Sequence, residues 1–184
     1  KIFEKSVSQR PTGKSFVFYE GPPSANGKPG IHHVMARTVK DLFCRYNTLK
    51  GFRIERKAGW DTHGLPIELQ VEKELGITKE DIGKKVTVEE YNQACRSTVM
   101  RYKDLWDDVT RRMGYWVDLD NPYITFENNY IESVWWLLKQ LYDKKTPAGD
   151  SYLYKGFTIQ PYSPAAGTGL STHELNMPGT YKDE

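Results

Sequence analysis

The feature that most constrains this chain is the glycine- and proline-rich stretch from Gly21 to His33, which reads Gly-Pro-Pro-Ser-Ala-Asn-Gly-Lys-Pro-Gly-Ile-His-His. Residues 15–19 before it are an apolar run rich in β-formers and too short for a helix, which predicts a buried strand. After it, apolar residues recur at helical spacing until Gly51 ends the pattern. These residues are Met35, Val39, Leu42, Phe43, Tyr46 and Leu49. The sequence therefore predicts a strand, a glycine-rich loop and a helix that begins with two histidines.

A loop of this kind can bind phosphate. The first-turn N–H groups of a helix have no partner within the helix, and the helix dipole favours an anion there. Glycines allow the backbone to approach a ligand closely, and a histidine at the helix start can donate a hydrogen bond to a phosphate oxygen. The same pattern is compatible with an ordinary turn between a strand and a helix, so spacing alone leaves both interpretations open.

A second glycine-rich turn, at residues 59–66, follows a predicted second strand at 52–58. Strand, helix and strand make one βαβ unit, whose crossover is right-handed by default. Ligands of open parallel sheets bind at the carboxyl ends of the strands, so we expect both loops to open on one crevice.

Four side chains near these loops could carry chemistry. Asp61 could bind an ammonium group, a metal or a ribose hydroxyl, and it could equally be a turn-forming aspartate. His63 is either a site residue or a hydrogen-bonded structural histidine. His32 and His33 are neighbours that point about 100° apart, so they cannot share a metal as an i, i+4 pair does. The helix N-terminus disfavours the protonated imidazole, so we expect both rings to be neutral.

The remaining pattern predicts mostly helices. Residues 1–14 read as a polar and partly mobile lead-in. A helix is expected from Pro66 to Gly76, a short helical turn from Thr78, and one long helix from the Thr87–Glu90 capping box to Gly114. The later features are a turn at Asn121-Pro122, a helix capped by Asn128 or Asn129 with Ile131, Val134, Trp135, Leu138 and Leu141 facing inward, and one or two strands within 152–161.

The composition excludes few functions. The chain has 184 residues, 26 Lys and Arg against 24 Asp and Glu, and a net charge of +2, which neither requires nor excludes a nucleic acid partner. Cys44 and Cys95 lie far apart and are expected to be buried, reduced thiols. No signal peptide and no bilayer-spanning run are found, so we expect no membrane partner and a cytoplasmic location. The ends look cut, which suggests part of a larger protein.

Six stretches together resemble the class I aminoacyl-tRNA synthetases, and among them the isoleucyl-tRNA synthetases. The most specific is Ala58–Glu68, which reads Ala-Gly-Trp-Asp-Thr-His-Gly-Leu-Pro-Ile-Glu, because the valyl, leucyl and methionyl enzymes differ there. The other stretches are residues 16–27, 37–41, 115–118, 130–139 and 170–174.

The resemblance implies an α/β fold. Residues 15–150 would form the first half of a class I Rossmann (HUP-type) catalytic domain with helical connections, after the lead-in at 1–14. Residues 151–184 would begin the inserted editing region. The implied reaction is ATP-dependent activation of isoleucine, with Mg²⁺ assisting, followed by transfer to tRNA(Ile). The full-length enzyme is expected to be a monomer.

The family's site residues fall on both loops. By resemblance, the ATP-binding residues are Gly21, Asn26, Gly27, Gly30 and His33. Amino-acid binding falls on the carbonyl of Pro22 and the carboxylate of Asp61, and the catalytic histidines are His33 and His32.

The HIGH signature departs from the family pattern. Its positions fall on Gly30, Ile31, His32 and His33, so the usual first histidine is a glycine and the usual glycine is a histidine. We hypothesise that His32 supplies the missing contact with ATP from a shifted position.

A second departure concerns zinc. Relatives often carry a Cys-Pro-x-Cys knuckle where this chain has Ser163-Pro-Ala-Ala166, so no zinc is expected in this segment. The editing body and the lysine-rich KMSKS loop lie beyond Glu184 in the family, so these 184 residues should not edit and should aminoacylate poorly alone. Alternatives are a nucleotidylyltransferase, which shares the histidine-headed helix, and a synthetase-derived module that binds tRNA or protein without catalysis.

Overall fold

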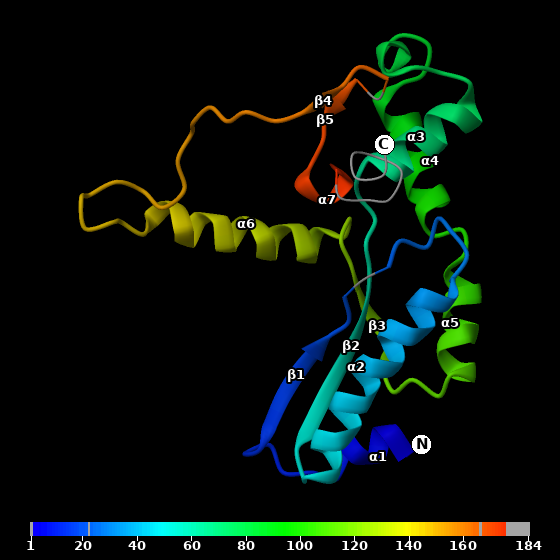
Figure 1. Cartoon of the computed structure of the whole chain (residues 1–184), viewed down its shortest axis with the longest axis vertical. Helices are drawn as coiled ribbons and strands as arrows, with labels where there is room; N and C mark the ends of the chain where they lie inside the picture. Colours follow the sequence, from blue (N-terminus) through cyan, green and yellow to red (C-terminus); the bar gives the residue numbers. More distant parts are fainter. Residues whose placement is uncertain (1, 22, 166, 176–184) are drawn as a thin grey trace.

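The larger of the two sheets in the described residues has three parallel strands in the order β1-β2-β3. The computed structural model describes residues 2–21, 23–165 and 167–175. Strand β1 (Ser15–Tyr19) pairs with β2 (Arg53–Trp60) from Ser15↔Arg53 to Tyr19↔Lys57, and β2 pairs with β3 (Asp118–Ile124). Helix α2 (Ile31–Leu49) connects β1 to β2 beside the sheet (Figure 1). The predicted βαβ unit is therefore confirmed.

Strand β3 is irregular in a way that corrects the predicted turn at Asn121-Pro122. These residues lie within β3. Lys57 pairs with Asp118 and Gly59 with Tyr123, so β3 contains more residues than β2 over this interval and bulges. The Asp118 carboxylate accepts hydrogen bonds from the backbone N–H groups of Asp120 (2.9 Å) and Asn121 (3.3 Å). The residues that were expected to form a turn therefore form a bulge within β3.

The predicted long helix is two helices. Helix α3 (Leu65–Leu75) ends at Gly76 with φ of 65°, and the one-turn η1 (Lys79–Asp81) follows. The Thr87–Glu90 capping box then opens α4 (Val88–Val99), and α5 (Lys103–Arg112) begins after a break. At the break, the backbone N–H of Tyr102 donates to the carbonyl of Ala25 (2.8 Å) instead of to its own helix. This tertiary hydrogen bond explains why a continuous helical pattern does not form one helix.

Helix α2 presents a polar face to the sheet, contrary to the usual pattern. Its buried residues are Arg37, Asp41, Cys44 and Thr48. Arg56 of β2, itself only 2 % exposed, donates to Asp41 (2.9 Å) and Thr48 (2.9 Å). The apolar residues that predicted the helix face outward, and Phe43 is 65 % exposed. The periodicity identified the helix correctly, but the buried side is set by the guanidinium on β2.

Two other segments expected to be buried are exposed. Phe16, Val17 and Tyr19 of β1 are exposed because β1 is an edge strand, and the helices α1 (Ile2–Ser8) and α2 pack on β2. Helix α6 (Asn128–Asp143), with Glu127 as N-cap, extends away from the sheet (Figure 1) and has no buried residue. Its predicted inward face is therefore not covered by the described part of the chain.

The ends of the chain also differ from prediction. The lead-in, which was expected to be partly mobile, contains helix α1. The ring centroids of Phe3 in this helix and of Trp116 are 6.1 Å apart. No strand forms within 152–161, and the later hairpin consists of β4 (Tyr162–Ser163) and β5 (Thr168–Gly169), before α7 (Thr172–Leu175). Cys44 and Cys95 are free thiols, as predicted, but only Cys44 is buried, whereas Cys95 is partly exposed. Among the described residues, no helix is both long and apolar enough to cross a bilayer.

Candidate functional site

The two glycine-rich loops meet at the carboxyl edge of the sheet. The first follows β1, and the second begins at Asp61, directly after β2. The backbone N–H of Asp61 donates to the carbonyl of Pro23 (3.0 Å), which joins the loops at their bases. The sequence predicts that both loops open on one crevice, and this hydrogen bond shows that they adjoin at their bases.

The first loop is anchored from several elements through buried contacts. Ala25 is fully buried and packs against Trp60 and Trp106. The carbonyl of Ala25 accepts from the backbone of Tyr102, and the carbonyl of Gly27 accepts from the Trp106 indole N–H (2.8 Å). The α4–α5 break and the Trp106 side chain of α5 therefore fix the backbone of this loop.

The other predicted loop residues lie around this anchored centre. Asn26 donates from its amide to Gln70 of α3 (3.2 Å), which ties the loop to the helix after Asp61. Gly21 is exposed, and a Cβ there would lie 3.4 Å from Nζ of Lys40. Pro22 lies outside the described residues.

His33 is held in one tautomer by the start of α2. The backbone N–H of Gly30 donates to Nδ1 of His33 (2.9 Å), the contact that an acidic residue makes in a capping box. Since Nδ1 is the acceptor, the proton of the neutral ring is on Nε2. The ring meets Trp106 edge-on at 4.8 Å between centroids. Burial, followed by the charges of His32 and Arg37, lowers the pKa of His33, which agrees with the predicted neutral imidazole.

The His32 ring lies beside Gly30. These are the two positions at which the signature departs from the family. Its ring centroid is 3.8 Å from that of His33. A Cβ added to Gly30 would lie 2.9 Å from Cε1 and 3.0 Å from Nδ1 of His32. The His32 ring therefore occupies the space in which a side chain at position 30 would begin, so the two exchanged residues are sterically coupled.

The second loop is anchored by a residue that the sequence analysis did not single out, Thr125. Its hydroxyl contacts the backbone N–H of Thr62 (3.0 Å), the Thr62 hydroxyl (2.8 Å) and Nδ1 of His63 (2.9 Å). The backbone N–H of His63 donates to the Asp61 carboxylate (3.3 Å). His63 is thus hydrogen-bonded, as its structural alternative predicted. A lone threonine after a strand carries no sequence signal for this contact.

A buried ionic network lies at the base of the first loop and was also missed. Glu20 is only 1 % exposed, and its carboxylate accepts from Lys40 (2.6 Å) and from the hydroxyl of Tyr115. The hydroxyl of Tyr123 donates to the backbone carbonyl of Glu20. Burial and the Glu20 charge raise the pKa of Tyr115, so this phenol remains a hydrogen-bond donor.

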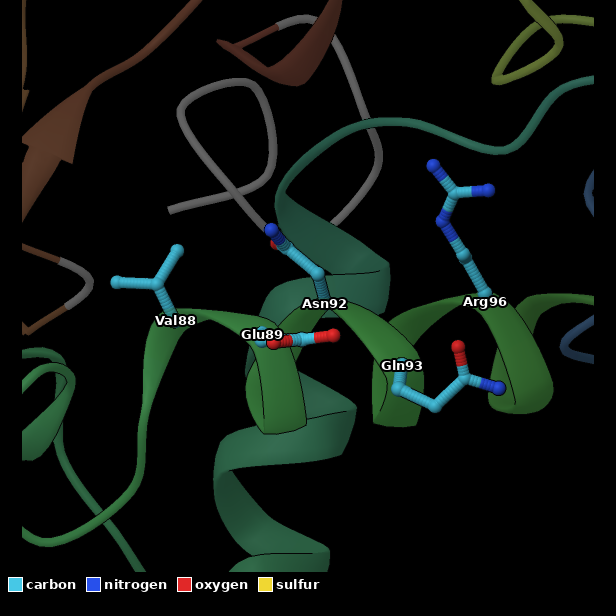
Figure 2. A pocket seen from close by; sticks show the side chains of 5 residues that line it. All are labelled: Val88, Glu89, Asn92, Gln93 and Arg96. Carbon is cyan, nitrogen blue, oxygen red and sulfur yellow. The ribbon is translucent and has the colours of Figure 1, made fainter.

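The described residues also line two surface hollows, one on α4 and a larger one whose lining includes Phe3, Arg56 and Trp116. Within residues 2–21, 23–165 and 167–175, no group of three or more His, Cys, Asp or Glu could hold a metal ion. Figure 2 shows an open hollow on the surface of α4. It is lined by Val88, Glu89, Asn92, Gln93 and Arg96, so it lies apart from the two loops.

Comparison with known proteins identifies the family. The family described as tRNA synthetases class I (I, L, M and V) matches residues 1–184. The chain belongs to the class I tRNA synthetases. This synthetase chain is 73 % identical over 183 residues to an isoleucine–tRNA ligase of Cytophaga hutchinsonii and 67 % identical to one of Porphyromonas gingivalis. Each match covers 100 % of this chain and 16 % of the relative, so the chain spans about a sixth of the length of these curated relatives.

A solved synthetase structure shares the fold. The LeuRS of Agrobacterium radiobacter K84, solved as a ternary complex with tRNA and LeuAMS, matches with a TM-score of 0.50 and 21 % identity. The match covers 72 % of this chain and 15 % of that one. It supports the class I α/β architecture that the resemblance predicted.

Proposed function

We propose that this chain forms the first half of the active site of an isoleucine–tRNA ligase. The observation that carries the proposal is the hydrogen bond from Asp61 to Pro23, because it brings the glycine-rich first loop and the aspartate loop to one edge of the sheet. The 73 % identity to the Cytophaga hutchinsonii isoleucine–tRNA ligase supports isoleucine as the substrate. In this proposal, ATP activates isoleucine and the acyl group is then transferred to tRNA(Ile).

The ATP would lie against the first loop and the start of α2. Gly21, Asn26, Gly27 and Gly30 would bring the backbone close to the nucleotide, and Mg²⁺ would enter with ATP as part of the substrate. His33 is suited to donate from Nε2 to a phosphate oxygen, since its Nδ1 already accepts from Gly30. His32, whose ring adjoins that of His33, would provide a second imidazole at the same edge.

The amino acid would be held between the two loops. The Asp61 carboxylate would pair with the ammonium group of isoleucine, and the carbonyl of Pro22 would accept one of its hydrogens. An oxygen of the isoleucine carboxylate then attacks the α-phosphorus of ATP, and pyrophosphate leaves with the electrons of the broken P–O bond. The protein would contribute mainly positioning and stabilisation of phosphate charge.

The domain boundaries belong to the same proposal. We infer that residues 15–150 are the catalytic half and that residues 151–184 begin the inserted editing region. The cysteines, Cys44 and Cys95, lie on α2 and α4, so the Ser163 segment has no thiolate to hold zinc. Elemental analysis of the purified protein is expected to find no zinc bound to this segment, and stoichiometric metal lost on mutation there would contradict the prediction.

ATP–pyrophosphate exchange tests the function directly. The full-length protein that contains this sequence is assayed with isoleucine, valine and leucine, beside Asp61→Asn as a nearly isosteric variant without the charge. We expect exchange to be strongest with isoleucine and kcat/KM for isoleucine to fall about 100-fold in the variant, because the ammonium loses its charged partner. A folded protein that shows no exchange with any amino acid would instead favour a synthetase-derived binding module.

A further inference from the structure

We propose that Thr125 is a positioning residue for the amino-acid site, which it serves by fixing the loop that carries Asp61. The inference rests on the proposed function, because Asp61 is taken as the partner of the substrate ammonium. Thr125 follows β3 immediately and is only 7 % exposed. Its hydroxyl reaches across to the residues directly after Asp61 in the neighbouring loop.

The hydrogen-bonding capacity of one hydroxyl accounts for all three contacts. A threonine hydroxyl has one proton to donate and two lone pairs to accept with. Thr125 can accept from the N–H and the hydroxyl of Thr62 and donate to Nδ1 of His63. In this arrangement the Thr125 hydroxyl uses its one proton and both of its lone pairs. His63 then carries its proton on Nε2, so its ring acts as a hydrogen-bond acceptor for the loop.

Asp61 is held between this cluster and the first loop. On one side its backbone N–H donates to the carbonyl of Pro23, and on the other its carboxylate accepts from the N–H of His63. If the Thr125 hydroxyl is removed, the buried N–H of Thr62 loses its acceptor and His63 loses its donor. The turn that orients the Asp61 carboxylate then loses the support on one side.

The strand itself sets Thr125 at this place. The backbone N–H of Thr125 donates to the carbonyl of Trp60 (3.2 Å), the last residue of β2. The bulge in β3 brings Tyr123 opposite Gly59, which in turn places Thr125 beside Thr62. Thr125 is therefore held by the sheet, and the Asp61 loop is held by Thr125.

The test compares Thr125→Val, which keeps the shape and removes the hydroxyl, with Thr125→Ser, which keeps the hydroxyl. Thr48→Val is the matched control: Thr48 is equally buried and also hydrogen-bonded, but it lies near the carboxyl end of α2. Pyrophosphate exchange in the full-length protein gives KM for isoleucine, KM for ATP and kcat for each variant. Thermal unfolding reports stability in parallel.

We expect Thr125→Val to raise KM for isoleucine about tenfold while KM for ATP changes less than about twofold. Thr125→Ser should keep KM for isoleucine at the wild-type value. Thr48→Val should lower the thermal stability without changing KM for isoleucine. Equal changes in both KM values, or a normal KM for isoleucine in Thr125→Val, would overturn the inference. A wild-type protein without exchange would refute the proposed function itself, a result separate from either outcome.

Discussion

The exchange of glycine and histidine in the signature can be tested with a double-mutant cycle. The change is Gly30→Ala in wild type and in a His32→Ala background. Gly30 has φ of −101° and ψ of 171°, an extended backbone that alanine adopts without strain, so the only added group is the Cβ. That Cβ would lie 2.9 Å from Cε1 of His32, and carbon atoms pack at about 3.5–4.0 Å. The His32 ring must therefore move by roughly 0.6–1 Å.

The displacement predicts a defined loss. A misplacement of about 1 Å can cost up to 10²-fold in rate. The exposed His32 ring can move and so absorbs part of this effect. We therefore expect kcat/KM for ATP to fall about tenfold, which corresponds to about 1.4 kcal/mol. In the His32→Ala background the same change should cost less than about twofold, since no ring remains to be displaced. Pyrophosphate exchange at varied ATP concentration measures all four proteins. An equal loss in both backgrounds would refute the steric coupling.

Restoring the family order is the complementary experiment. Gly30→His alone should lose exchange, because its side chain begins where the His32 ring lies. The double variant Gly30→His with His32→Gly should recover most of it. If the single variant is as active as the double one, position 32 does not contribute to ATP binding.

Three further predictions concern stability and pH. Gly59→Ala should lower the free energy of unfolding by about 1–3 kcal/mol in urea titrations, because its Cβ would lie 2.2 Å from the Tyr123 ring. An unchanged unfolding midpoint would show that the ring can move. Tyr115→Phe should cost about 1–3 kcal/mol by the same assay, since the buried carboxylate of Glu20 loses a donor, and no loss would mean that its lysine partner suffices. The lowered pKa of His33 means that the unfolded chain binds a proton at a higher pH than the folded one. The free energy of unfolding should therefore fall as pH drops below about 6.5, and His33→Gln should lack this dependence in denaturation at several pH values.

Local sequence patterns predicted much of the first βαβ unit and the position of the loops. Strand β1, helix α2 and strand β2 follow from apolar runs and glycine stops, and Asp61 is a candidate because it follows a strand in a glycine-rich turn. Which face of α2 is buried could not be read in the same way. Arg56 lies on β2 and donates a hydrogen bond to Asp41 of α2, so the polar face of the helix is the one that packs on the sheet.

The missed features all depend on contacts between distant residues. The α4–α5 break comes from the hydrogen bond between Tyr102 and Ala25, and nothing in the local pattern at Tyr102 differs from a helix. Thr125 and Glu20 act through hydrogen bonds to residues that are remote in sequence. Single polar residues beside strands are common, so their role appears only when the sheet brings their partners together.

The strand order has a consequence for how the molecule folds. β1 and β2 are joined by a single helix and can pair early, whereas β3 must return to β2 across α3, α4 and α5. Closing this longer loop costs more chain entropy, so the last strand should dock late. The Asp61 turn would then become ordered only at the end of folding, and hydrogen exchange during refolding should protect the Thr62 amide after the amides of β1 and α2.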